Sequence, residues 1–339
     1  MLAAFCTVLS ILATPLVMHR KCLTQLILCF ILLLFALPSL ALPHQQQAIN
    51  SQIVFIRDFS GNNSDLYQLD LSTSVSIQLT DVLDQYFTRY VESADCNVNR
   101  QSIIFAAGGN LYSVGFNGAD VTPLVYVSDF VSPRWNANGD GIFVSAREFP
   151  SRYQDFYKAN VDGLNVVLLR ADGFNYNSLT LAPSGERIAA TFYDEGMYGI
   201  IIMNTDGTLP TRMIETSDYI EAATWSPDGQ KIAFASNRDG MLNIYTIRPD
   251  GSDVQQITSN SGNNLYPVWS QDGQWLAFSS DRDGVGYQIY IMNLNTTAVQ
   301  RITGSEFENS DNFPQCWIGS YTPSTPTPIP TNTPTSTPT

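Results

Sequence analysis

The sequence contains a long repeated pattern, and this repeat constrains the fold more than any other feature of the chain. ATWSPDGQKIAFASNRDG at 223–240 is followed by PVWSQDGQWLAFSSDRDG at 267–284, so that Trp225 and Trp269 lie 44 positions apart. A period in this range is typical of repeat architectures. In such folds each copy is one structural unit, which buries its apolar faces by packing against its neighbours.

One copy contains four short strand patterns separated by turns. In SPDG, at 226–229, proline presets φ and glycine accepts the positive φ that ends a tight turn. The predicted strands are Ala222–Trp225, Lys231–Ala235, Asn243–Ile247 and Val254–Thr258. Four strands and three turns in about 44 residues are typical of one blade of a β-propeller.

Fainter copies occupy the rest of the chain between residues 47 and 318. When the repeats are aligned, the residues at the position of Trp225 are, in chain order, Cys96, Trp135, Leu181, Trp225 itself, Trp269 and Cys316. The first blade has no strand of this kind at its N-terminal side, whereas a spare one lies at Asn312–Trp317. We therefore predict an all-β fold, a six-bladed propeller of four-stranded antiparallel blades. Its C-terminal strand completes blade one and closes the ring, which removes exposed strand edges.

The pattern WSPDGxxIAFxSxRDG…IYxxxxDGxxxxxIT resembles the WD40-like repeat of TolB-type propellers. The resemblance is strongest in 222–258 and 267–303. It implies a propeller that docks other proteins of the cell envelope. TolB itself carries an α/β domain before its propeller, and we expect that domain to be missing here. Related propellers accompany peptidases and form carbohydrate lyases, so the fold alone leaves the function open.

The two ends of the chain have compositions of their own. Residues 1–42 contain no Asp or Glu, and the apolar run Cys22–Leu37 follows a short basic stretch and precedes Ser39-Leu40-Ala41. This layout predicts a secretory signal cleaved after Ala41. The alternative is an uncleaved N-terminal membrane anchor. A separate interpretation concerns residues 1–17: translation starts at Met18, and the start codon at Met1 was assigned too early. Residues 319–339 are rich in Pro and Thr, a composition typical of an extended, disordered tail.

Charge and cysteine content exclude some partners and suggest a cross-link. The chain has 31 acidic and 17 basic residues, and without Arg20 and Lys21 its net charge is −16. Such a chain repels phosphate backbones, so nucleic acid is excluded as a partner. Only Cys96 and Cys316 lie outside the leader, at equivalent positions of neighbouring inner strands, and they form the candidate disulfide.

The residue types present argue against most enzyme chemistries. The two histidines, His19 and His44, both precede the first blade, which excludes a Ser-His-Asp triad or a histidine-ligated metal within the ring. We predict no metal and no cofactor, and we interpret NRDG and DRDG as turns capped by Asp rather than as calcium loops. Paired carboxylates remain as an alternative for glycoside cleavage. The candidates are Asp194, Glu195, Glu306, Glu308 and Asp311.

One face of the predicted ring collects longer and more varied loops, those after the second and fourth strand of each blade. We call it the long-loop face, and the opposite one, with turns such as SPDG and RPDG, the short-turn face. Aromatic side chains rimmed by polar groups are typical of recognition surfaces. The candidate binding residues are Tyr86, Phe87, Arg89, Tyr90, Tyr126, Phe130, Arg152, Tyr153, Phe174, Tyr176, Tyr198 and Tyr219.

These observations predict an exported, non-catalytic propeller, periplasmic, secreted or at the cell surface, that binds a protein or peptide through its long-loop face. The alternative function is binding or cleavage of carbohydrate by the loop aromatics and carboxylates. A membrane contact is expected only through an uncleaved N-terminal segment.

Overall fold

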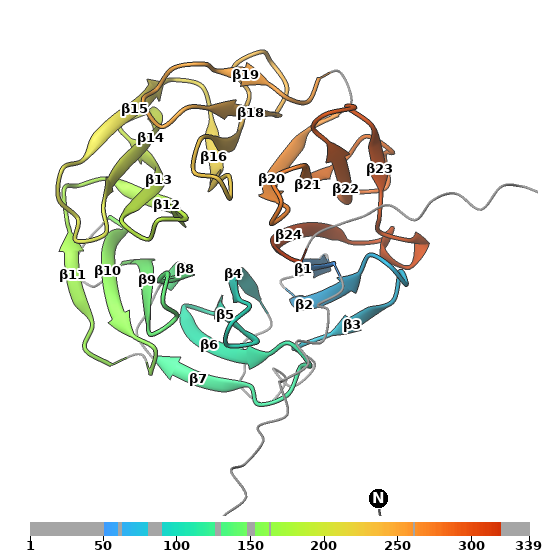
Figure 1. Cartoon of the computed structure of the whole chain (residues 1–339), viewed down its shortest axis with the longest axis horizontal. Helices are drawn as coiled ribbons and strands as arrows, with labels where there is room; N and C mark the ends of the chain where they lie inside the picture. The colour runs from blue at the N-terminus through green and yellow to red at the C-terminus, as the bar shows by residue number, and fades with distance from the viewer. Residues whose placement is uncertain are drawn as a thin grey trace, which may run out of the picture. The chain divides into compact units, whose positions relative to one another are not determined.

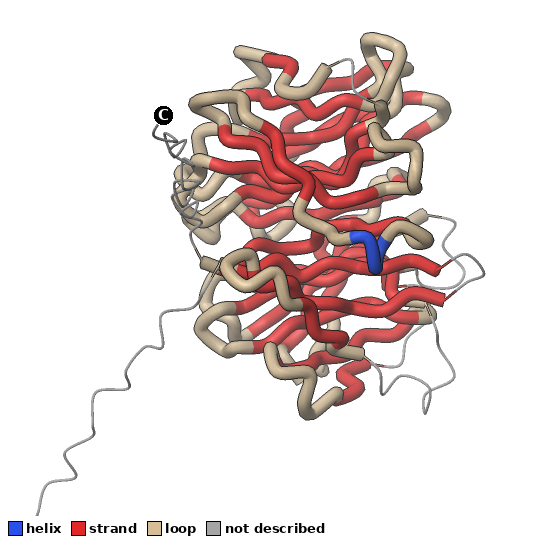
Figure 2. The backbone as a smooth tube through the Cα atoms, turned by 90° about the vertical axis from the view of Figure 1, so that its right-hand side faces the viewer, coloured by secondary structure: helices blue, strands red, loops and turns tan. Residues whose placement is uncertain are grey.

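The computed structural model describes residues 51–59, 63–80, 90–125, 130–147, 153–162, 164–259 and 262–319. These residues form six four-stranded antiparallel sheets arranged as the blades of a ring (Figure 1). From the side, the blades are seen as stacked strands, with one short 3₁₀ turn, η2 (Ser305–Phe307), between β23 and β24 (Figure 2). The predicted six-bladed propeller is thereby confirmed.

The strands of each blade follow one another from the centre of the ring to its rim. The innermost strands are β4 (Val91–Asn97), β8 (Phe130–Trp135), β12 (Asn175–Leu181), β16 (Ile220–Trp225), β20 (Asn264–Trp269) and β24 (Asp311–Ile318). The second strands are β1 (Gln52–Phe59), β5 (Ser102–Ala107), β9 (Gly141–Ala146), β13 (Arg187–Asp194), β17 (Ile232–Ser236) and β21 (Trp275–Ser280). The third strands are β2 (Asn63–Asp70), β6 (Asn110–Gly115), β10 (Asp155–Asn160), β14 (Met197–Asn204), β18 (Asn243–Ile247) and β22 (Gln288–Asn293). The outermost strands are β3 (Ser76–Gln78), β7 (Thr122–Val125), β11 (Val167–Arg170), β15 (Thr211–Thr216), β19 (Gln255–Gln256) and β23 (Val299–Arg301).

The C-terminal strand β24 closes the ring, as the sequence predicts. It pairs antiparallel with β1 from Gln52↔Ile318 to Asp58↔Asp311, and so becomes the innermost strand of blade one. The apolar residues form one cluster between each pair of neighbouring blades, and the cluster between blades six and one includes Phe55, Trp275 and Trp317. Burial between blades, rather than within one blade, therefore holds the ring together.

Each innermost strand shifts register once against the second strand of its blade. The residues passed over by the ladder are Glu92, Val131, Asn177, Ala222 with Ala223, Tyr266 with Pro267, and Gln315. Ala222 and Tyr266 have φ values of 55° and 52°, in the left-handed region that is uncommon for residues other than glycine. Such β-bulges bend a strand and redirect its side chains. Here they all lie on the strands nearest the ring axis.

The pairing of β24 with β1 corrects one detail of the predicted alignment. Trp317 pairs with Ile53, just as Trp225 pairs with Ile232 in blade five. Trp317, and not Cys316, therefore occupies the Trp225 position of blade one, and the match of the Phe-Pro pair in β24 with the Tyr-Pro pair in β20 is one residue out of register. Cys96 pairs with Ile103 and does occupy that position in blade two. The two cysteines are thus offset by one residue, contrary to the predicted equivalence.

The sequence places two of the loops of the long-loop face at Tyr193–Gly199 and Ala171–Asn177, and both are shorter in the structure. Tyr193–Gly199 was expected to be a loop, but β13 and β14 continue through it and leave only Glu195 and Gly196 as a hairpin turn, both with positive φ. This is the conformation of the tightest hairpin turns. The predicted loop Ala171–Asn177 also ends early, because β12 begins at Asn175. By contrast, NRDG and DRDG do form tight turns, each closed by a hydrogen bond that the N–H of its glycine donates to the carbonyl of the first turn residue.

The predicted leader at residues 1–42 and most of the predicted tail at 319–339 lie outside the described residues. Within the part of the chain that the structure describes, no helix is long and apolar enough to cross a membrane.

Candidate functional site

The six innermost strands surround a central channel with a cavity of about 830 Å³. Its wall is made of residues from β4, β8, β12, β16, β20 and β24, and it includes the bulged residues Glu92, Asn177, Tyr266 and Gln315. Its charged residues are Glu92, Asp95, Arg134 and Glu221. A concave site with a few convergent polar groups is the usual form of a ligand-binding site in proteins.

Hydrogen bonds between side chain and backbone link each pair of neighbouring blades around the channel. The Ala94 N–H donates to Gln315 Oε1 at 2.9 Å, and the Trp135 N–H donates to Asp95 Oδ2 at 2.8 Å. Further links join the remaining blades: Leu179 N–H to Ser132 Oγ, Trp225 N–H to Thr180 Oγ1, Trp269 Nε1–H to the Thr224 carbonyl, and Ser279 Oγ–H to the Asn312 carbonyl. Many polar groups in the middle of the channel therefore hold the ring together.

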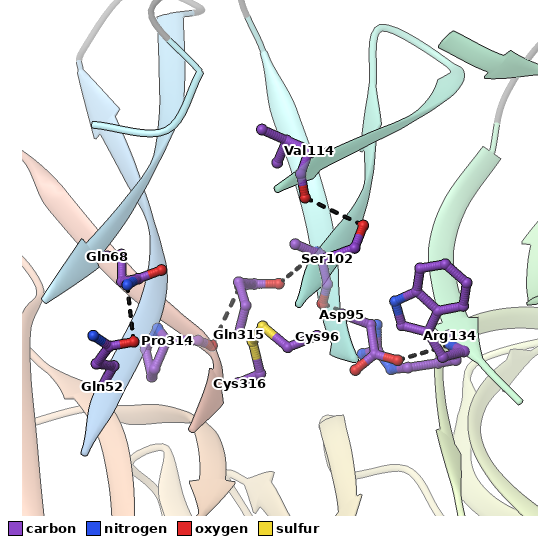
Figure 3. The surroundings of a disulfide bond; sticks show 12 residues. Gln52, Gln68, Asp95, Cys96, Ser102, Val114, Arg134, Pro314, Gln315 and Cys316 are labelled. Carbon is purple, nitrogen blue, oxygen red and sulfur yellow. Dashed lines mark hydrogen bonds between the residues drawn. A yellow bond between two sulfur atoms is a disulfide. The ribbon is translucent and has the colours of Figure 1, made fainter. Parts of the chain in front are cut away.

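The disulfide lies in this wall, between blades one and two (Figure 3). Cys96 on β4 and Cys316 on β24 are bonded, with their Cα atoms 6.1 Å apart. Arg134 lies nearby and donates through Nη1 to the carbonyls of Pro133 at 2.7 Å and Ala94 at 3.3 Å. Burial raises the pKa of the Asp95 carboxyl, and the positive charge of Arg134 offsets part of this effect. Asp95 and Arg134 thus stabilise the wall of the channel through these contacts and do not form a reactive site.

Aromatic rings from four blades lie on the long-loop side of the ring, and two of them, Tyr219 and Tyr266, line the cavity. The ring centroids are 4.9 Å apart for Tyr193 and Tyr198, 5.1 Å for Tyr198 and Tyr219, and 5.1 Å for Tyr266 and Phe313. Tyr287 contacts Phe313 with a centroid distance of 5.9 Å. We call this set the tyrosine arc: Tyr193, Tyr198, Tyr219, Tyr266, Phe313 and Tyr287. Aromatic pairs at such distances stabilise one another while they keep a large contact area.

Glu221 lies between the two halves of the tyrosine arc. The Tyr219 hydroxyl donates a hydrogen bond to Glu221 Oε2. Burial and then the charge of Glu221 raise the pKa of Tyr219 well above its ordinary value. The same two causes, in the same order, raise the pKa of Tyr266, with a smaller contribution from Tyr90. The mouth of the channel is therefore both aromatic and negatively charged.

The raised phenol pKa values give a testable result. They occur at Tyr90, Tyr176, Tyr219, Tyr245, Tyr266, Tyr287 and Tyr290. Because these phenols ionise less readily in the folded chain than in the unfolded one, they favour unfolding as the pH rises past about 10. In an alkaline titration of phenolate absorbance, the part of the absorbance change that comes from these tyrosines should appear only when the protein unfolds. The denatured control should titrate as a single group, and a single reversible group in the native protein would contradict the structure.

The structure places some of the sequence-predicted binding residues near this mouth. Tyr198 and Tyr219 belong to the tyrosine arc, and Tyr90 precedes β4 with 45% of its surface exposed. Tyr153 is 43% exposed. Phe130 is the first residue of β8. The remaining candidates lie outside the described residues: Tyr86, Phe87, Arg89, Tyr126 and Arg152.

The structure corrects the expected exposure of Tyr176 and Phe174. Tyr176 is fully buried between blades three and four, and its hydroxyl donates to Asp172 Oδ2 at 2.8 Å. Phe174 is partly buried and stacks on Phe192, with the ring centroids 5.1 Å apart. Both side chains pack into the fold, because β12 begins inside the predicted loop. Tyr176 offers no surface to a partner.

Several residues at the mouth of the channel are not among those that the sequence predicts. Tyr266 and Phe313 precede prolines within inner strands, where apolar residues were assigned to the core. Glu221 was assigned no role, and Tyr287 belongs to the pattern that precedes a third strand. The available signal was the recurrence of Tyr or Phe before Pro in the last two inner strands.

Two of the five carboxylates considered for glycoside cleavage, Glu308 and Asp311, have structural partners. Glu308 forms an ion pair with Arg301 at 3.3 Å, and Asp311 Oδ1 accepts the Tyr287 N–H at 2.8 Å. The backbone of Asp194 pairs with that of Met197 in the hairpin of blade four, and Glu195 lies in the turn of this hairpin. Within the described ranges, no three His, Cys, Asp or Glu residues are grouped so as to hold a metal ion.

Comparison with known proteins supports the fold. The model of the TolB beta propeller domain matches residues 142–316, more than half of the chain. A chain of a nidogen/laminin complex is 9% identical, with a TM-score of 0.63, and the match covers 79% of this chain and 97% of that one. The putative TolB of Agrobacterium tumefaciens is 17% identical, with a TM-score of 0.59 and coverage of 78% and 96%. TolB of Acinetobacter baumannii is 18% identical, with a TM-score of 0.51 and coverage of 74% and 69%. No curated protein sequence matches the chain.

The ring of six blades and its channel define a β-propeller with an aromatic, acidic mouth on the long-loop face. At the identities of these solved structures, their likeness shows the fold alone. The match of the family model goes further: the chain belongs to the TolB beta propeller domain family.

Proposed function

We propose that this protein is an exported, non-catalytic scaffold that binds a protein or peptide partner through its long-loop face. The observation that carries this proposal is the tyrosine arc around Glu221 at the mouth of the channel. Tyrosines supply large contact areas at a low cost in side-chain entropy, and they are enriched at the energetic centres of protein interfaces.

Two further features favour docking over catalysis. The mid-channel groups Asp95, Ser132 and Thr180 accept hydrogen bonds from the backbone of the next blade. The arc is built on strands and on the tight β13–β14 hairpin, so its shape is largely set before a partner arrives. A preorganised surface loses less conformational entropy on binding. The solved TolB and nidogen/laminin structures share this fold, and a docking role agrees with the latter being a protein complex.

Export is part of the same proposal. The basic and apolar pattern before Ala41 supports a signal peptide or an N-terminal anchor. The bonded pair Cys96–Cys316 agrees with an oxidising compartment, such as a periplasm or the cell exterior.

An affinity capture tests the docking function. Exposed aromatics of the long-loop face, Tyr90, Tyr153 and Tyr193, are replaced together by Ala in one bait. In a control bait, the exposed Val167, Leu168 and Leu209, on or beside the outer strands, are replaced by Ser. From an envelope extract of the producing cells, we expect one partner protein to be retained by the wild-type and control baits. The bait without the aromatics should retain less than a tenth as much.

Two results would count against docking. Retention of the same protein by all three baits would place its binding site elsewhere. Retention of glycan alone, lost with the aromatic side chains, would favour the alternative of a carbohydrate-binding propeller.

A further inference from the structure

The mouth of the channel gathers negative charge on its inner side. Glu221 and Glu92 line the cavity from β16 and β4, on different blades. Asp58 and Asp311 face each other in the pairing of β1 with β24, and the charge of Asp311, after burial, raises the pKa of Asp58. The charges of Asp58 and Glu92 in turn reach Tyr90 and raise the pKa of its phenol, again after burial. Negative potential therefore spreads across the mouth from several blades.

Three described arginines of the inner part of the ring form hydrogen bonds with other groups. Arg57 donates to Ser310 Oγ at 2.9 Å and to the Glu306 carbonyl at 2.6 Å. Arg282 donates to Asn264 Oδ1 at 2.9 Å and lies over the Tyr290 ring. Arg134 lies deeper in the wall and donates to backbone carbonyls. These contacts tie the three arginines to groups other than Glu221.

Among the residues that the structure describes, Glu221 is held by hydrogen bonds but forms no ion pair. Its partners are the hydroxyls of Tyr219 and Tyr266, and a phenol carries no positive charge at neutral pH. The rings of Tyr219 and Tyr266 line the same cavity as the carboxylate. Aromatic faces attract cations, most strongly where water is partly excluded, and a carboxylate beside them adds a charge-assisted hydrogen bond.

We propose that the long-loop mouth of the channel binds a basic side chain, the guanidinium or ammonium group of a peptide segment, at Glu221 between Tyr219 and Tyr266. The cavity of about 830 Å³ has room for such a side chain together with part of its main chain. This inference rests on the proposed docking function, because it names the group that the partner inserts. It commits to a peptide rather than to a free small cation, because the tyrosine arc extends the contact surface beyond the cavity to Tyr198 and Tyr193.

The test uses the full chain and probes of defined chemistry. The first probe is the capped peptide acetyl-Gly-Ser-Arg-Ser-Gly-amide, and its control replaces arginine by citrulline, which has the same shape without the charge. The second probe is acetyl-arginine-amide, which has the guanidinium but no flanking residues. Affinities are measured by calorimetry or NMR titration at low ionic strength, because salt screens such contacts.

Two variants of equal charge separate the site from the general acidity of the protein. Glu221→Gln removes the proposed partner and keeps its shape. Glu186→Gln removes one negative charge at an exposed position in a turn of the short-turn face. Both variants are first checked for unchanged thermal unfolding. A third variant, Tyr266→Phe, keeps the charge of Glu221 and the aromatic face and removes only the hydrogen bond from the Tyr266 hydroxyl, whereas Tyr266→Leu removes both the hydroxyl and the aromatic face.

We expect the arginine peptide to bind the wild type at least ten times more tightly than the citrulline peptide. We expect the affinity for the arginine peptide to fall at least tenfold in Glu221→Gln, about threefold to tenfold in Tyr266→Leu, and less than twofold in Glu186→Gln. The proposal is overturned if arginine and citrulline peptides bind alike, or if both Gln variants behave alike. If acetyl-arginine-amide binds as tightly as the arginine peptide, the claim that the site binds a peptide segment is overturned.

Failure of this inference is distinguishable from failure of the docking function. If the wild-type bait and a Glu221→Gln bait retain the same partner equally, the docking function is supported and the proposed cation site is contradicted. If the long-loop aromatics have no effect on any partner, the docking function itself falls.

Discussion

Removal of the disulfide should lower the free energy of unfolding by about 5 kcal/mol. Cys96 and Cys316 are separated by 220 residues, and the chain-entropy model gives about 5 kcal/mol for a loop of this length. The bond joins β24 to blade two, so it ties the two ends of the ring together. We expect the double variant Cys96→Ser/Cys316→Ser to fold, because β24 still pairs along its length with β1. Its thermal midpoint should fall by about 10 °C or more.

Chemical denaturation of the oxidised wild type, the reduced wild type and the double variant measures this effect. The reduced wild type and the double variant should agree, because both lack the cross-link. Thiol titration of the unreduced protein in denaturant supplies the control and should find neither Cys96 nor Cys316 free. Two free thiols, or a difference in unfolding free energy below about 1 kcal/mol, would contradict a formed and stabilising bond.

Replacement of Trp317 by Ala should cost about 3–5 kcal/mol of stability. Trp317 is 5% exposed and packs in the cluster between blades six and one, and its indole Nε1–H donates to Ser51 Oγ at 2.7 Å. The substitution leaves a cavity at the seam where the last strand meets the first blade. We expect this seam to open first, which should increase the rate of proteolysis near β24.

Unfolding in urea, combined with limited proteolysis, tests the role of Trp317. Val299→Ala, on an exposed outer strand, is the control and should change the free energy of unfolding by less than about 0.5 kcal/mol. If Trp317→Ala were no more destabilising than this control, closure of the ring by β24 would not depend on the cluster between blades six and one.

The sequence predicts the ring because its evidence is local and repeated. Turns such as SPDG and alternating strands such as NIYTI specify a blade without reference to the rest of the chain. The spare strand at Asn312–Trp317 then identifies how the ring closes. The register of β24 is different, because its Phe-Pro pair suggests an alignment with β20 that is one residue off, and only the pairing with β1 places Trp317 opposite Ile53.

The site is less predictable because it depends on which side chains meet across blades. Tyr176 and Tyr219 occur in similar surroundings in the sequence, yet Tyr176 is buried beside Asp172 while Tyr219 lines the channel. Glu221 and Tyr266 come together only when blades five and six lie side by side. Such contacts between distant segments carry no signal at the level of local composition.

Site-specific photo-cross-linking in the producing cells tests the central claim, that the long-loop face is the docking face. A photoreactive phenylalanine analogue replaces Tyr193, which is 36% exposed in the tyrosine arc, or Leu209, which is 76% exposed in a turn of the short-turn face. The account predicts a discrete adduct with one partner protein from position 193 and none from position 209. The same adduct from both positions, or an adduct from position 209 alone, would contradict it.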